Sequence, residues 1–240
     1  MSSLSVILPA FNEAGNLPDA VGEGLVVLDR LAGAGEILVV DYGSTDQTWA
    51  VLTALARQDS RVRALRHGSN AGYGAALRTG FGAARGDLIF FTDADLQFDL
   101  GELPALLSLA ARADIVAGFR ASRMDPGYRR VNALAWGWVV HAVFGLDVID
   151  VNCAFKVLHR RVLDGISLRS SGAFINTELL VRARAAGFTL AQVPVSHFPR
   201  ARGVQTGARP AVILKAIVEL LSLVRERDRP RVEAVLAERL

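Results

Sequence analysis

The 240-residue sequence contains a single cysteine, Cys153. A disulfide framework needs at least two cysteines and a cysteine-ligated zinc site needs several, so both kinds of cross-link are excluded. A chain of this length can bury a sizeable hydrophobic core without them. The near absence of cysteine also fits a reducing compartment, and we expect a cytoplasmic protein.

Long apolar runs are missing as well. No stretch reaches the roughly 18 uninterrupted apolar residues of a membrane-spanning helix. The nearest segments, Ala133–Leu146 and Ala211–Val224, are broken by His141 and by Lys215 and Glu219. The first three residues lead straight into an apolar strand, without the basic region that opens a signal peptide. We therefore expect no integral membrane protein, and any contact with the inner face of the cell membrane would be peripheral.

Lysine is scarce: Lys156 and Lys215 are the only lysines among 27 basic side chains. The positive charge is thus almost entirely arginine, whose planar guanidinium suits bidentate recognition of phosphate. The formal net charge of +3 is small, whereas nucleic-acid-binding proteins show a concentrated basic face. We expect no nucleic-acid partner.

What is present is a regular alternation of apolar strands and helices over the first half of the chain. Strands are expected at residues 4–9, 36–41, 62–66, 88–92 and 115–118, with helices between them. Short loops in such an alternation predict a parallel α/β sheet. Helices at 129–146, 171–187 and 210–225 and a strand at 189–194 follow. Without a linker or repeat, we expect one domain over residues 1–225 and a charged tail at 226–240.

Polar residues follow three of the expected strands, at Pro9–Glu13, Asp41–Asp46 and Asp93–Gln97. Ligands of open α/β sheets bind at the carboxyl ends of the strands. Asp93 and Asp95 place two carboxylates two residues apart, with a carboxamide further on, which suits Mg²⁺ or Mn²⁺. Such an ion would neutralise a diphosphate leaving group. The competing interpretation is that both aspartates only end a strand and cap the next helix.

Two further segments are suggestive but weak alone. Asp41 ends a strand where acids of nucleotide-binding proteins contact a ribose or base, while Ser44 or Thr45 could cap the next helix. Asn70–Ala75 is a glycine-rich helix start that lets the backbone approach a phosphate or base, although its spacing is not that of a P-loop.

Taken together, these segments resemble the family 2 glycosyltransferases, and within them the polyprenyl-phosphate (dolichyl-phosphate) mannose and glucose synthases. The resemblance covers residues 1–205 in order and also includes Gly118–Arg120, Cys153–Lys156 and His197–Gly203. It implies the GT-A fold, an α/β fold with a mostly parallel central sheet flanked by helices. The nucleotide-sugar half would lie at residues 1–120 and the acceptor half at 121–225.

The resemblance also implies roles for individual residues. The nucleotide-sugar pocket would comprise Pro9, Phe11, Glu13, Asp41, Asn70, Gly72, Asp93 and Ala94. The metal ligands would be Asp93, Asp95 and Gln97, and the acceptor phosphate would meet Arg129, His197, Arg200 and Arg202. Asp95, Arg120 and Arg202 would be catalytic, with Arg120 facing the sugar or the phosphates. An ordinary solvated surface loop is the alternative for the basic segment.

One position departs from the family. Two adjacent aspartates are usual where this chain has Asp41 and Tyr42. If the missing carboxylate normally contacts the base, donor preference would differ. Tyr42 would then either stack on the base or serve in packing.

The activity that the resemblance implies is inverting, metal-dependent transfer of a hexose from a GDP-mannose or UDP-glucose type donor to a polyprenyl monophosphate. A phosphate monoester is largely dianionic at neutral pH because its second pKa is about 6, so it needs little help from a base. A hydroxyl acceptor would need one, and Asp150 and Glu178 are the candidates. The alternatives are another cell-envelope glycan or small hydroxyl acceptor, or a non-catalytic nucleotide-sugar-binding protein.

Two apolar helices are compatible with more than one kind of binding partner. Trp136 and Trp138 lie two residues apart and so cannot share one face of the helix at 129–146. Exposed tryptophan beside arginine suits a helix at a membrane surface, whereas a helix buried on several sides or a dimer contact fits equally well. The apolar helix at 211–224 allows the same interpretations, so a homodimer or a membrane-protein partner stays open.

Overall fold

The computed structural model describes residues 2–31, 34–121, 127–200, 202–203 and 210–237, without the side chains of 127–130 and 228–237. Within these residues a seven-stranded sheet has the order β3-β2-β1-β4-β6-β5-β7. The strands are β1 Leu4–Ala10, β2 Gly35–Asp41, β3 Val62–Arg66, β4 Leu88–Thr92, β5 Ile115–Arg120, β6 Phe155–His159 and β7 Leu190–Val195. Neighbours are parallel except around β6, which runs antiparallel to β4 and β5. The expected mostly parallel sheet is confirmed.

Alternation of side chains along the strands builds a core on each face of the sheet. In β1, Val6 and Leu8 belong to one buried cluster, and Ile7 between them belongs to the other. The first cluster includes residues of α1 Leu17–Arg30, α2 Thr48–Gln58 and α4 Leu103–Ala110. The second includes residues of α3 Tyr73–Ala83 and α7 Ile175–Ala185. Helices therefore cover both faces, as buried parallel strands require.

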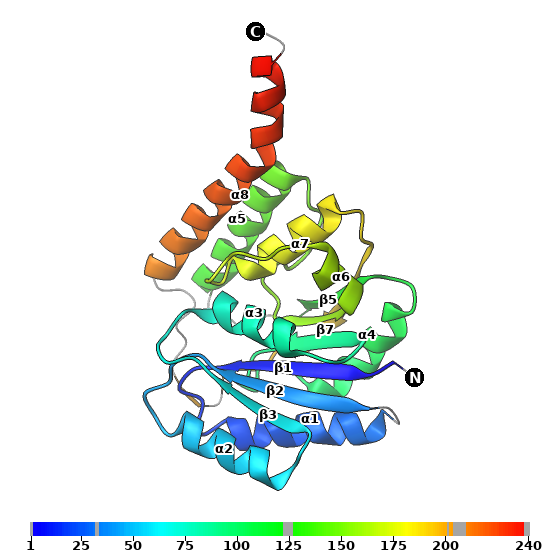
Figure 1. Cartoon of the computed structure of the whole chain (residues 1–240), viewed down its shortest axis with the longest axis vertical. Helices are drawn as coiled ribbons and strands as arrows, with labels where there is room; N and C mark the ends of the chain where they lie inside the picture. The colour runs from blue at the N-terminus through cyan, green and yellow to red at the C-terminus, as the bar shows by residue number, and fades with distance from the viewer. Residues whose placement is uncertain (1, 32–33, 122–126, 201, 204–209, 238–240) are drawn as a thin grey trace.

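The remaining helices lie over the α7 side of the sheet. They are α5 Gly127–Phe144, the short α6 Arg160–Gly165 and the long α8 Pro210–Ala237, while the 3₁₀ turn η1 Leu100–Glu102 precedes α4. Leu220 and Leu223 of α8 pack with Phe174, and Trp136 and Phe144 of α5 border this small cluster. α8 and α5 thus form an outer layer beyond α7 (Figure 1). None of the described helices is long and apolar enough to cross a membrane.

One strand was missed, and two expected helix boundaries are wrong. β6 was not expected at all, since residues 155–159 show no clear alternation and include Lys156, which is wholly buried. α7 begins at Ile175 rather than at residue 171. α8 does not end at Arg225 but continues as a helix to Ala237, through the segment expected as a charged tail.

Candidate active site

The turns after β1 and β2 are joined by side-chain hydrogen bonds. Asn12, whose φ is 56°, donates its N–H to the Ser44 hydroxyl at 2.9 Å and accepts the Thr45 N–H at 2.9 Å. The Glu13 N–H donates to the Thr48 hydroxyl at 2.8 Å. Because parallel strands β1 and β2 end side by side, these bonds fix Glu13 at the carboxyl edge of the sheet.

Three acids, Glu13, Asp93 and Asp95, lie together at this edge, and one arginine pairs with two of them. Arg200 donates to Glu13 and also lies 3.3 Å, Nη1 to Oδ2, from Asp95. Burial raises the pKa of Glu13, and the nearby charge of Asp95 adds to the shift, while Asn16 and Arg200 oppose it. Burial likewise raises the pKa of Asp95, against the opposing charge of Arg200. The cluster therefore holds more acid than Arg200 neutralises.

Asp93 is the most perturbed acid of the cluster. Burial, followed by the charge of Asp95, raises its pKa to about 7. Its Oδ1 is buried without a hydrogen-bond partner among the described residues. An unpartnered carboxylate oxygen beside a second carboxylate fits a hard divalent cation. Within the described part of the chain no group of three acid, histidine or cysteine side chains could hold a metal alone, so other ligands would complete the coordination.

Gln97 and His197 tie the segment after β4 to the loop after β7. The Gln97 side-chain amide donates to the Phe198 carbonyl at 3.0 Å, and the Phe198 N–H donates back to the Gln97 carbonyl at 2.8 Å. The His197 ring packs edge-on against Phe98, with ring centroids 5.3 Å apart. The basic loop is thereby anchored over the acidic cluster.

Arg202 and Arg120, which were also expected at the site, pair with acids outside this cluster. Arg202 donates to the Gly15 carbonyl and lies 3.0 Å from Asp19 of α1. Arg120 makes a bidentate pair with Asp150, at 2.6 and 2.9 Å, and its charge lowers the pKa of Asp93. The side chain of Arg129 lies outside the described residues.

The residues expected at the nucleoside form a second group. Asp41 is fully buried, accepting the Ser44 N–H at 2.8 Å and lying 3.3 Å from Arg66 Nε. Tyr42 stacks on Phe11, with centroids 5.3 Å apart and planes at 20°. The tyrosine at the departing position thus pairs with an expected pocket residue, and burial raises the pKa of its hydroxyl. Pro9 and Ala94 are buried beside this edge.

The expected glycine-rich turn lies at the start of α3. Asn70 accepts the Gly72 N–H at 3.0 Å, and Gly72 has φ +97°. A Cβ at Gly43, after β2, would lie 2.4 Å from the Asn70 nitrogen, so the two turns are in direct contact. Tyr73, the first residue of α3, is partly buried with its hydroxyl enclosed, and the charge of Asp93 helps to raise the pKa of that hydroxyl. The nucleoside residues and the acidic cluster therefore both contact the start of α3.

Both candidate general bases are engaged elsewhere. Glu178 accepts the N–H groups of Arg169 and Ser170, at 3.0 and 2.7 Å, and the Arg182 side chain at 2.8 Å. Asp150 holds Arg120, as described above. Neither carboxylate is free to take a proton from an acceptor hydroxyl in this arrangement.

Comparison with known proteins identifies the family of the chain. The model of glycosyl transferase family 2 matches residues 5–166. Glycosyltransferase AglD of Haloferax volcanii is 31% identical over 207 residues, covering 82% of this chain and 33% of the relative. The undecaprenyl-phosphate 4-deoxy-4-formamido-L-arabinose transferase of Pseudomonas aeruginosa is 32% identical over 203 residues, covering 83% of this chain and 59% of the relative. The chain thus spans a third to three fifths of these relatives.

Solved structures show the fold. Mannosyl-3-phosphoglycerate synthase from Rubrobacter xylanophilus superposes with a TM-score of 0.74 at 19% identity, covering 97% of this chain and 75% of the other. Glucosyl-3-phosphoglycerate synthase from Mycobacterium tuberculosis, in complex with Mn²⁺, UDP and glucosyl-3-phosphoglycerate, gives 0.72 at 23% identity, covering 92% and 79%. The expected GT-A fold is confirmed. With a family model over more than half of its length and relatives above 30% identity, the chain belongs to glycosyl transferase family 2.

Proposed function

We propose that the chain transfers a hexose from a nucleotide-diphosphate sugar to a polyprenyl monophosphate, with inversion and with a divalent metal. The observation that carries the proposal is the pair Asp93 and Asp95 at the end of β4, where one Asp93 oxygen is buried without a hydrogen-bond partner in the described part of the chain. The surplus of buried acid around it favours a cation at this edge.

The donor would lie along the carboxyl ends of β1, β2 and β4. Asp93 and Asp95 would hold Mg²⁺ or Mn²⁺, with Gln97 completing the first or second shell. When bound, the ion would supply positive charge to the diphosphate leaving group. The nucleoside would contact residues around the Phe11–Tyr42 stack and the adjacent turns, namely Pro9, Glu13, Asp41, Asn70 and Gly72. A relative in complex with UDP and Mn²⁺ has the same fold.

The acceptor phosphate would be held by the basic loop, through His197, Arg200 and Arg202, together with Arg129. Two observations favour a phosphate over a hydroxyl acceptor. The candidate bases are both paired, and a dianionic phosphate monoester needs no base. The Pseudomonas aeruginosa relative is named as an undecaprenyl-phosphate sugar transferase. The chain's own task is then to orient two anionic substrates and offset their repulsion, to which Arg120 beside Asp93 contributes.

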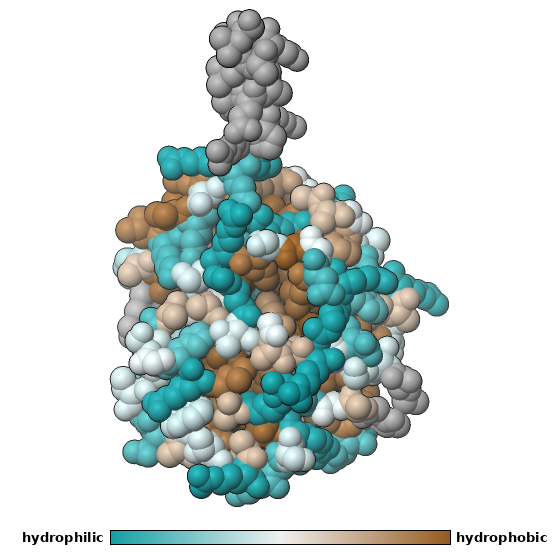
Figure 2. Space-filling view, viewed as in Figure 1, coloured by the Kyte–Doolittle hydropathy of each residue, from teal (hydrophilic) through white to brown (hydrophobic). Residues whose placement is uncertain are grey.

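A lipid acceptor would be reached from the membrane surface. Val131, Leu134 and Trp138 are exposed along one face of α5, and α8 exposes a second apolar row, comprising Ile213, Leu214, Ile217, Val218 and Leu221. Hydrophobic surface gathers where α8 meets α5 (Figure 2). An apolar helical face of this kind suits peripheral binding to a bilayer.

Transfer assays test the proposal directly. Purified protein is incubated with undecaprenyl phosphate in detergent and with labelled GDP-mannose, UDP-glucose or a 4-deoxy-4-formamido-L-arabinose donor, with Mn²⁺ or with chelator. We expect metal-dependent appearance of one lipid-linked hexose, whereas transfer of the arabinose derivative, a pentose, would refute the hexose assignment. Transfer to a glycan or small hydroxyl compound but not to the lipid phosphate would refute the acceptor assignment. Nucleotide binding without transfer or donor hydrolysis would refute enzymatic function.

A further inference from the structure

The first residues of α3 pack against the 169–172 loop, which lies in the second half of the sequence. The Ser171 carbonyl accepts the N–H groups of Gly74 and Ala75, at 2.9 and 3.3 Å. A Cβ at Gly72 would lie 2.3 Å from that same carbonyl oxygen, and one at Gly74 would lie 2.6 Å from the Gly172 carbonyl. Contact this close leaves no room for α3 to shift without moving the loop.

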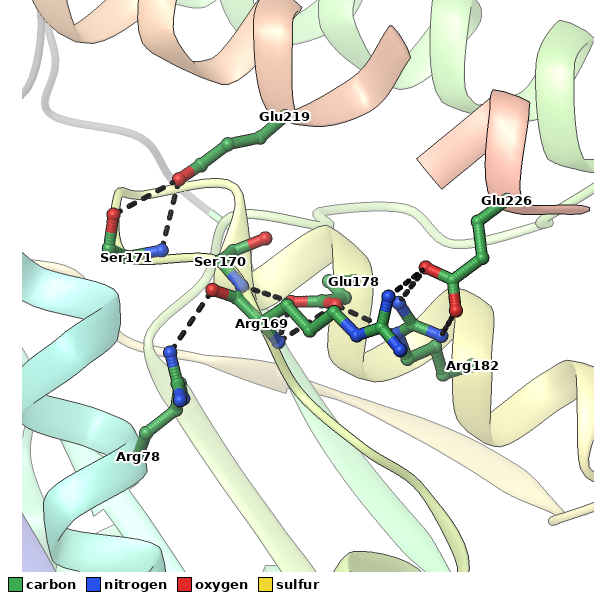
Figure 3. Close-up of polar contacts among 8 residues, drawn as sticks. All are labelled: Arg78, Arg169, Ser170, Ser171, Glu178, Arg182, Glu219 and Glu226. Atoms are coloured by element: carbon green, nitrogen blue, oxygen red, sulfur yellow. Dashed lines mark hydrogen bonds and ion pairs between the residues drawn. The ribbon is translucent and has the colours of Figure 1, made fainter. Parts of the chain in front are cut away.

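The loop is itself held by carboxylates rather than by neighbouring strands. Glu178 of α7 accepts its backbone N–H groups at Arg169 and Ser170, and Glu219 of α8 accepts those of Ser171 and Gly172 at 3.0 and 3.1 Å (Figure 3). Hydrogen bonds from backbone N–H groups to a charged acceptor are among the stronger ones in proteins. α8 therefore fixes the residue on which α3 is seated.

α8 also reaches the glycine-rich turn at Gly72, directly before α3. Lys215, one helical turn before Glu219, lays its methylene groups against Gly172, 3.3 Å from where a Cβ there would stand. Its Nζ lies 3.6 Å from the corresponding position at Gly72. Lys215 and Glu219, on two successive turns of α8, thus contact the 169–172 loop, and Lys215 also approaches Gly72 before α3.

The residues around the start of α3 contact both parts of the candidate site, the nucleoside residues and the acidic cluster. Asn70 packs against Gly43, directly after Asp41 and Tyr42 on the nucleoside side. Tyr73 lies beside Asp93 on the metal side. A shift at the start of α3 would therefore move both groups at once.

From these contacts we infer that Glu219 is a positioning residue for the donor site, acting through the 169–172 loop and the start of α3. The inference rests on the proposed function, because it assigns Glu219 to the binding of the nucleotide donor. Glu219 touches none of the three site acids, so its effect on the nucleotide passes through Ser171.

Three variants separate positioning from general stability. Glu219→Ala removes the acceptor of the loop N–H groups, whereas Glu219→Gln keeps one acceptor oxygen. Glu226→Ala is the matched control: Glu226 lies on the same helix and binds the side chains of Arg182 and Arg169, without touching the loop backbone. Affinity is measured for UDP, GDP and dTDP with Mn²⁺, and melting temperature is recorded for each variant.

We expect Glu219→Ala to raise the Kd for the nucleotide that the wild type binds by about three- to thirtyfold. Glu219→Gln should recover most of that loss, and Glu226→Ala should stay within about twofold although it lowers the melting temperature. Hydrogen exchange without ligand should quicken at residues 73–77 in Glu219→Ala and not in Glu226→Ala.

Equal effects of Glu219→Ala and Glu226→Ala on Kd, or unchanged exchange at residues 73–77, would overturn the inference while leaving the proposed function standing. If the wild type binds none of the three nucleotides, the donor part of the proposed function fails, and this inference fails with it.

Discussion

Arg200 and Asp95 form an ion pair, 3.3 Å from Nη1 to Oδ2, across the edge where the donor would bind. They come from loops 105 residues apart in the sequence. The same guanidinium also bonds Glu13, so in this structure one arginine neutralises much of the acid that a metal would otherwise meet. A cation arriving at Asp95 must compete with Arg200.

This competition gives the first prediction. Arg200→Ala should bind Mn²⁺ more tightly than the wild type in the absence of nucleotide, by about three- to tenfold, since it removes a competing charge worth about 1 kcal/mol. Titration followed by Mn²⁺ electron paramagnetic resonance measures the affinity. Arg202→Ala is the control, because Arg202 pairs with Asp19 outside the cluster. Weaker binding in Arg200→Ala would show that Arg200 does not compete for the metal.

The stack of Tyr42 on Phe11 gives the second prediction. Tyr42→Phe keeps the aromatic pair and should leave nucleotide affinity within about twofold, whereas Tyr42→Ala should weaken it by about three- to tenfold. Isothermal titration with the preferred nucleotide measures both. An equal loss in the two variants would mean that the hydroxyl, and not the ring, serves the donor.

Arg120 and Asp150 give a prediction about stability. Both side chains are nearly buried, at 13% and 8% exposure, and their pair is bidentate. Asp150→Ala leaves a buried guanidinium without its carboxylate and should cost about 3 kcal/mol of unfolding free energy. Urea unfolding of Asp150→Ala and of the double variant with Arg120→Met tests this. The double variant should recover part of the loss, and if it is no more stable than Asp150→Ala, the loss does not come from the stranded charge.

Asp114 gives a prediction about acid stability. It accepts the N–H and hydroxyl of Thr189, at 2.8 and 2.6 Å, and pairs with Arg161, and these bonds lower its pKa to about 2. Because the pKa falls on folding, the stabilisation is fully present above about pH 4 and is lost as the pH falls towards 2. Asp114→Asn should cost about 1–2 kcal/mol at pH 6 and almost nothing near pH 2. A difference from wild type that stays constant across this range would contradict the account.

Much of the site could be predicted because its residues directly follow apolar strands. The last four residues of β4, Ile89–Thr92, are buried, so Asp93 and Asp95 had to lie at the carboxyl edge. The rest depends on contacts without a local pattern. Lys156 is buried in β6 because its ammonium donates to the Val151 carbonyl at 3.2 Å, which no strand pattern would predict. Glu219 shows only as an interruption of an apolar helix, and nothing in its neighbourhood indicates a loop 48 residues away.

The ion pairs that Arg120 and Arg202 form with acidic residues could likewise not be predicted from the sequence. Arg120 and Arg202 were expected to face substrates, and the structure pairs them with Asp150 and Asp19. The sequence shows these basic residues but not their acidic neighbours, because only the tertiary arrangement brings them together.

The most direct measurement is thermal stabilisation of the wild type and Asp95→Asn by UDP, GDP and dTDP, each with and without Mn²⁺. The account predicts a metal-dependent rise in melting temperature with one nucleotide in the wild type, and its loss in Asp95→Asn, whose fold stays intact. A rise that needs no metal or survives in Asp95→Asn would contradict the assignment of the donor and its metal to this edge of the sheet, as would no rise with any of the three nucleotides.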